Sequence, residues 1–193
     1  MALSLEQRLD QVESNIKKPS FRENKGLGNE VGYYVFDYPA NKELVVRERI
    51  EYMKAKNNKG SDGYQLVVFD LYDIVMDILE KEGLIEQCIA FEKKKGMAKI
   101  VNSIGNLLRL NDDENLIVKH IQELTPKDAV ILLVGVGKCY PFLRSHKVLN
   151  TLHQAIDNIP VVMFFPGKYD GQELVLFSEI KDDNYYRAFR LVE

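Results

Sequence analysis

The chain has 193 residues, of which 46% are hydrophobic and 28% are charged, and its net charge is −3. This length fits one domain of ordinary size, and the apolar content excludes wholesale disorder. The slightly acidic balance argues against a surface devoted to nucleic acid, so we expect direct binding of nucleic acid to be absent. Two well-separated cysteines, Cys88 and Cys139, make neither a disulfide scaffold nor a zinc cluster.

The first 18 residues are amphipathic rather than uniformly apolar. Ser4 and Gln7 have the spacing of a capping box, and apolar residues at helical spacing follow until Pro19. This is not the pattern of a signal peptide. No apolar run approaches the ~20 residues that cross a bilayer. We therefore expect a cytoplasmic protein without a membrane partner.

Strand-like and helix-like patterns alternate after residue 32. Residues 33–36 predict a strand, and a helix is expected from about 42 to 56. Residues 66–69 are all apolar, as in a strand buried on both faces, and the helix after them ends at Gly83. Strands alternating with helices indicate a parallel sheet.

The second half of the chain resumes this alternation after a helical stretch, 84–124, with three apolar stripes at helical spacing. The short segment 174–177 is ambiguous. Arg187 and Arg190 suggest that the last strand lies at an edge of the sheet. The strands predicted here are 130–134, 161–165 and 185–192, with a helix over 145–156.

The predicted fold class is α/β, with an open, mainly parallel sheet flanked by helices. The layout is Rossmann-like or P-loop-like, but without a Walker A loop. We expect residues 1–193 to form a single α/β domain, with 84–124 as a helical insertion within it. Ligands of open α/β sheets bind beyond the carboxyl ends of the strands, so the turns after the strands are the first places to inspect.

The turn at 135–147 is the first candidate for a ligand site. The segment 135–150 contains no acid, and helix N-termini offer free N–H groups to anions. A nucleotide or a phosphate is the ligand that this pattern suggests. The alternative is a tight turn that glycine permits, before a helix that begins with basic residues and binds no ligand. The candidate anion-binding residues are Lys138, Arg144, Ser145 and His146.

The same turn lacks a complete motif. Leu132 stands where the first glycine of a Walker A loop would be, and Cys139 stands where Ser or Thr should follow Lys138. Cys139 near His146 and His153 suggests a nucleophile and a base, but a small thiol after a strand more often packs in the core. We therefore predict no catalytic residue.

Two further charged runs have ordinary explanations. Acidic residues at spacings of three, four and three follow the strand at 66–69, and they fit the solvated face of an amphipathic helix better than a metal site. Lys93–Lys95 fits a favourable interaction with a helix C-terminus. We predict neither a metal nor a cofactor. The acidic residues are Asp70, Asp73, Asp77 and Glu80.

A set of stretches spread from about residue 20 to the end of the chain resembles the BrxB family of the BREX (bacteriophage exclusion) defence systems. The first is 164–171 followed by 174–177, a strand that ends in Pro and two glycine turns. The other stretches that resemble this family are 26–31 with the strand to Pro39, 135–146, 159–162 and 183–192.

The resemblance implies a role rather than a reaction. Members of the family belong to operons with a methyltransferase, a large ATPase and a phosphatase-like PglZ protein, and the system methylates host DNA and blocks phage replication. The resemblance implies a non-enzymatic core subunit that binds another component, with PglZ favoured and the ATPase or methyltransferase possible. Tyr and Arg are enriched at protein–protein hot spots. The candidate partner-binding residues are Tyr140, Arg144, Tyr185, Tyr186 and Arg187.

Overall fold

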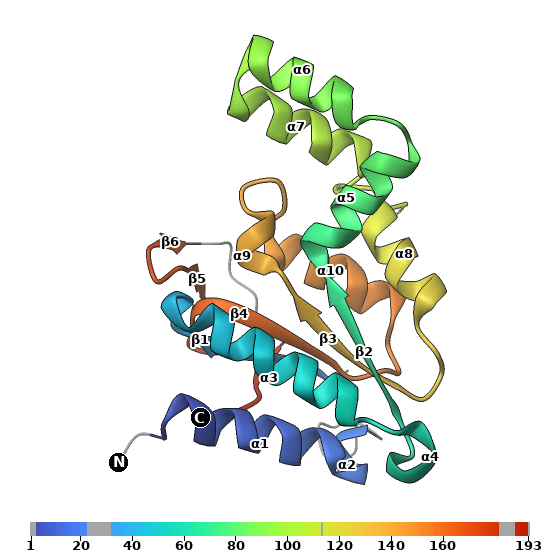
Figure 1. The fold of residues 1–193 in the computed structure, drawn as a ribbon, viewed down its shortest axis with the longest axis vertical. Helices are drawn as coiled ribbons and strands as arrows, with labels where there is room; N and C mark the ends of the chain where they lie inside the picture. The colour runs from blue at the N-terminus through green and yellow to red at the C-terminus, as the bar shows by residue number, and fades with distance from the viewer. Residues whose placement is uncertain (1–2, 23–31, 113, 182–187, 193) are drawn as a thin grey trace.

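The fold is built on five parallel strands in the order β2-β3-β4-β1-β7 (Figure 1). The structure is a computed structural model that describes residues 3–22, 32–112, 114–181 and 188–192. This confirms the predicted α/β class with an open, mainly parallel sheet. The parallel strands are β1 (Tyr33–Tyr38), β2 (Gln65–Asp70), β3 (Ala129–Val134), β4 (Val161–Tyr169) and β7 (Phe189–Arg190).

Helices cover both faces of this sheet (Figure 1). On one face lie α1 (Leu5–Lys17) and α3 (Glu43–Lys56), and on the other lie α5 (Leu71–Lys81), α8 (Leu116–Leu124) and α10 (Ser145–Ala155). Within the described residues, no helix is both long and apolar enough to cross a membrane. The short helices are α2 (Pro19–Arg22), η1 (Ala40–Lys42), α4 (Lys59–Asp62) and α9 (Val136–Cys139).

The core consists of two apolar clusters, one on each face of the sheet. Successive side chains of a strand point to opposite faces, so Val130 and Leu132 of β3 pack toward α1 and α3. Ile131 and Leu133 pack toward α5, α8 and α10. All four side chains have 0% exposure. The uninterrupted apolar runs of the sequence follow from this burial on both faces.

The predicted elements occur with small changes in length. The capping box is present, because the side chain of Ser4 accepts a hydrogen bond from the Gln7 N–H and that of Gln7 accepts one from the Ser4 N–H. The ambiguous segment 174–177 contains β5 (Leu174–Leu176), which pairs antiparallel with the end of β4 and with β6 (Ile180–Lys181). The predicted last strand is represented at the sheet edge by β7, while residues 182–187 lie outside the described part.

The segment predicted as a helical insertion holds α6 (Ile85–Lys95), α7 (Met97–Leu107) and α8. These helices differ in what they contact. Ile117 and Ile121 of α8 are fully buried against the sheet. In contrast, α6 buries none of its eleven residues, and with α7 it extends away from the sheet at the top of Figure 1. We refer to α6 and α7, residues 85–107, as the arm.

Candidate functional site

Strand β4 extends past the usual ligand position of an open parallel sheet. Ligands bind where the connections of neighbouring strands diverge to opposite faces. Here β1 leads to α3 on one face, β3 leads to α10 on the other, and β4 lies between these two strands. β4 continues past this point, because Gly167–Tyr169 extends it and pairs antiparallel with β5. The extension therefore runs past the point where the connections of β1 and β3 diverge.

Asp37, near the end of β1, fixes this extension in place. Its carboxylate accepts hydrogen bonds from Arg8 of α1 at 2.7 Å and from the Tyr169 N–H at 3.2 Å. Arg190 of β7 lies 3.5 Å from the same carboxylate. The Tyr169 hydroxyl donates to the Ala188 carbonyl at 2.7 Å, and burial raises the pKa of this hydroxyl to about 12. These contacts join both ends of the chain to the carboxyl edge of the sheet.

The two glycines of the turn after β3 make room for side chains of the protein. Gly135 has φ 77°, a conformation that favours glycine, and a Cβ there would collide with the Asp70 carboxylate. A Cβ on Gly137 would lie 2.9 Å from Phe177 Cε1 and 3.2 Å from Pro166 Cγ. Both glycines are therefore required by the packing of β2 and of the β4–β5 hairpin, and neither opens a space for a phosphate.

Lys138, the first candidate for anion binding, points at two carboxylates. Its Nζ lies 2.5 Å from Asp70 Oδ2 and 3.3 Å from Asp73 Oδ1. Burial disfavours the charge of this lysine, but its hydrogen bonds and attraction to Asp70 and then Asp73 outweigh burial and raise its pKa. Asp70 also caps α5, accepting from the N–H groups of Tyr72 and Asp73. The acid-free loop of the sequence thus has acids beside it in space.

The other predicted anion-binding residues lie at the start of α10. Arg144 is exposed and occupies the N-cap position, where it makes no side-chain capping bond. His146 is buried, with 6% exposure. Ser145 begins α10, and its side chain lies outside the described residues. Lys138 therefore faces α5, whereas Arg144 and His146 lie at the start of α10.

The candidate partner-binding residues fall into two groups. Tyr140 and Arg144 line one shallow surface cavity together with Leu176 and Ile180 of the β5–β6 region. The Tyr140 ring stands edge-on to Phe177 at 6.3 Å between ring centroids, so it is partly held by packing. The three other candidates, Tyr185, Tyr186 and Arg187, lie outside the described residues.

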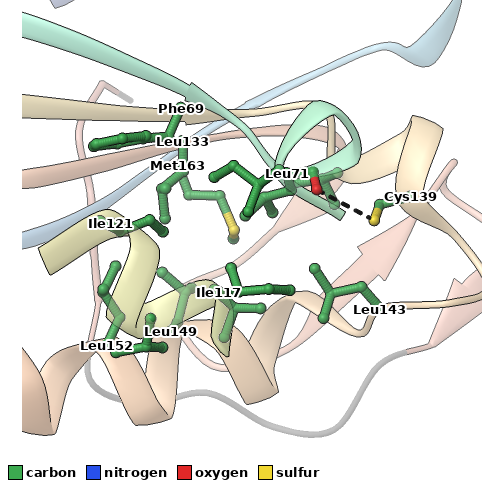
Figure 2. Close-up of a cluster of buried hydrophobic side chains, with 14 of the residues drawn as sticks. Phe69, Leu71, Ile117, Ile121, Leu133, Cys139, Leu143, Leu149, Leu152 and Met163 are labelled. Carbon is green, nitrogen blue, oxygen red and sulfur yellow. Dashed lines mark hydrogen bonds between the residues drawn. The ribbon is translucent and has the colours of Figure 1, made fainter. Parts of the chain in front are cut away.

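Cys139 lies inside the core and has no features of a nucleophile. Figure 2 shows its thiol among buried side chains that include Leu71 and Leu143. The thiol lies 3.8 Å from the Leu71 carbonyl, to which it donates. Burial raises the pKa of this thiol to about 12, and only the thiolate is a strong nucleophile. The packing interpretation of this cysteine is the one that its surroundings support.

A cleft of about 430 Å³ lies at the carboxyl ends of β2 and β3, where Asp70, Val134 and Gly135 line it. Its walls are formed by α3, α5 and α8. Acids outnumber bases on these walls, so the field favours a cationic group over a phosphate. The spacing of Asp70, Asp73 and Asp77 predicted a solvated helix face. No pattern in the sequence showed that Glu43 and Glu51 of α3 line the same cleft. No group of three His, Cys, Asp or Glu side chains within the described residues is placed to hold a metal.

These features define a class of protein: a parallel α/β domain in which side chains of the protein pack against the turn after β3. The family model "BREX protein BrxB" matches residues 67–191. A BREX protein BrxB from Bacillus cereus (strain H3081.97) is 49% identical over 189 residues, covering 98% of both chains. Another from Escherichia coli O9:H4 (strain HS) is 35% identical, covering 97% of this chain and 92% of the relative. The chain belongs to the BrxB family and is a component of a BREX system. No solved structure gave a significant match.

Proposed function

We propose that this protein is a non-enzymatic core subunit of a BREX system, and that it is needed for phage exclusion and host DNA methylation because it binds another component. A PglZ-like phosphatase-family protein is the favoured partner, and the ATPase and methyltransferase are the next candidates. This choice of partner rests on the operon composition that the family resemblance implies. Membership in a BREX system itself implies other BREX components as partners.

One observation carries the proposal: the turn that would hold a ligand in this fold is filled by the protein's own side chains. Asp70 occupies the space over Gly135, and Phe177 and Pro166 occupy the space over Gly137. Lys138 is held by Asp70 and Asp73 rather than directed at open solvent. A turn packed in this way leaves no room for a phosphate over either glycine, which favours a role in assembly over ligand binding at this turn.

The experiment is co-expression of the tagged protein with its operon neighbours, followed by affinity purification, size-exclusion chromatography and mass spectrometry. We expect PglZ or another component to co-elute at fixed stoichiometry. Tagged PglZ should recover this protein in the reciprocal purification, and the tag alone should recover neither. The purified protein by itself should show no hydrolysis of nucleotides or phosphate esters. Failure to associate with any BREX component would overturn the proposal.

An alternative proposal is a nucleotide- or phosphate-binding domain that uses the 135–147 turn. The exposed Arg144 beside the first turn of α10 favours it, because that helix end has no side-chain cap. A native-state ligand at a hundredfold excess over its Kd adds about 2.7 kcal/mol of stability. ATP, ADP and inorganic phosphate should therefore raise the melting temperature in wild type and in Lys81→Ala, but not in Arg144→Ala. The absence of any shift in wild type would rule this alternative out.

A further inference from the structure

The outer part of the arm is exposed on all sides. Every residue from 89 to 99, which covers the end of α6, Gly96 and the start of α7, is exposed. Large apolar side chains are among them: Ile89 is 40% exposed, Phe91 is 37% exposed and Met97 is 46% exposed. The inner part of the arm reaches the core, through the buried Ile100 and Ile104 of α7 and the half-buried Ile85 and Cys88 of α6. Figure 1 shows this pair of helices standing clear of the sheet.

Contacts between α6 and α7 cover part of these apolar side chains, but 37–46% of each remains exposed. Single exposed apolar residues are common on protein surfaces. Here three large ones, each 37–46% exposed, lie within nine residues at the outer end of the arm. Apolar groups concentrated in this way are typical of a surface that another protein covers.

The same end of the arm is strongly basic. Residues 91–99 contain four lysines and one glutamate, in a chain whose net charge is −3. The lysines are Lys93, Lys94, Lys95 and Lys99, and no ion pair links any of them to another described residue. A basic end beyond an otherwise acidic protein is complementary to an acidic surface and steers association with it.

We propose that the outer arm, residues 89–99, is the surface through which this protein binds another BREX component, and that the partner presents an acidic protein surface with an apolar centre. The inference rests on the proposed function and specifies its interface. A protein fits better than nucleic acid for two reasons. Of the three large apolar side chains only Phe91 offers a flat ring on which a base can stack, and the remainder of the chain is acidic and repels phosphates.

The test compares three variants in the co-purification described above, at two salt concentrations. The first is the triple reversal Lys93→Glu, Lys94→Glu and Lys95→Glu. The second, Phe91→Ser with Met97→Ser, removes apolar contacts and keeps the charge. The matched control, Lys54→Glu, Lys119→Glu and Lys127→Glu, makes the same change in net charge at exposed positions outside the arm. Circular dichroism and thermal melting verify that each variant folds.

We expect the charge reversal to reduce partner binding at least tenfold and the apolar variant to reduce it several-fold, with the control at the level of wild type. Wild-type binding should weaken as salt rises, and binding by the charge-reversal variant should lose most of this dependence. Equal recovery of the component by wild type and both arm variants would overturn the arm as the interface and leave the proposed function standing. Recovery of no component by wild type would overturn both.

A labelled DNA duplex of random sequence distinguishes the other class of partner. We expect no binding of wild type to this duplex at physiological salt. Duplex binding that the charge reversal abolishes and the apolar variant preserves would overturn the proposal of a protein partner and assign the arm to nucleic acid.

Discussion

The turn after β3 and the arm contain the same sequence feature, a lysine beside a glycine, in opposite surroundings. In the turn, Lys138 follows Gly137, is 28% exposed and lies against the carboxylates of Asp70 and Asp73. In the arm, Lys95 precedes Gly96, and the residues around it are exposed. The positive charge of Lys138 in the turn is therefore neutralised by carboxylates of the fold, whereas the positive charge of Lys95 in the arm faces outward. The difference arises because β2 and α5 place Asp70 and Asp73 beside Lys138.

The cysteines give the largest expected difference between the two regions. Cys139 belongs to the turn and is buried, and Cys88 belongs to the arm and is half-buried. Burial raises both thiol pKa values, that of Cys139 to about 12, which leaves a thiolate fraction of about 10⁻⁴ at pH 8. In single-cysteine variants made by Cys→Ser, a disulfide reagent should modify Cys88 at least about a hundredfold faster than Cys139. Equal rates would mean that the turn opens readily to solvent.

Gly135→Ala should be the most destabilising single substitution in the comparison. The new Cβ would meet the Asp70 carboxylate, and the residue would keep a φ of 77°. Strain and overpacking together should lower the free energy of unfolding by about 2–4 kcal/mol. Gly83→Ala is the matched control, because Gly83 has φ 66° but nothing within 4 Å of a Cβ. Its cost should be only about 1 kcal/mol. Denaturant unfolding measures both, and equal losses would contradict the packing of Asp70 on Gly135.

Asp70→Ala should have the next largest effect. The substitution removes the cap of α5 and the closest partner of Lys138. We expect a loss of about 1–2 kcal/mol. Asp70→Asn keeps an oxygen that can cap the helix and removes only the charge, so it should lose about half as much. Urea unfolding of both variants separates the contribution of the helix cap from that of the ion pair. A larger loss of unfolding free energy in Asp70→Asn than in Asp70→Ala would contradict this assignment.

Lysine substitutions should give the smallest effects and still distinguish the two regions. Lys138→Ala should lower the free energy of unfolding by about 0.5–1 kcal/mol, whereas Lys94→Ala should change it by less than about 0.3 kcal/mol. The raised pKa of Lys138 also fixes the sign of the pH dependence. Its stabilisation is fully present below the ordinary value of 10.5 and is lost as the pH rises through the higher folded value. The difference between wild type and Lys138→Ala should therefore be constant at neutral pH and shrink above about pH 10.5.

The strands and helices that form the core could be predicted because their patterns reflect burial directly. The apolar run that became β3 is buried on both faces, and Ser4 with Gln7 forms the capping box that their spacing predicted. Short elements were harder to predict. The segment that contains β5 was ambiguous because its three residues pair with the end of β4, and pairing of that kind depends on the hairpin around it.

The candidate site could be located from the sequence but not interpreted from it. The sequence directed attention to Lys138 and to the absence of acids near it in the chain. Asp70 and Asp73, more than 60 residues earlier, lie beside it because β2 and β3 are neighbouring parallel strands. The carboxyl ends of these two strands meet at one edge of the sheet, and no local pattern records which strands are neighbours. The acidic cleft was missed for the same reason, because its walls combine α3, α5 and α8.

The sequence by itself determined the α/β class, the elements buried on both faces of the sheet and, through the stretches that resemble BrxB, the family. These properties depend on local periodicity and on motifs read along the chain. The tertiary structure alone decided that Asp70 neutralises Lys138, that Phe177 covers Gly137, and that 89–99 stands away from the core. The first two depend on contacts between elements that are distant in sequence, and the third depends on the absence of such contacts around 89–99. Only the order of the strands brings such elements together or keeps them apart.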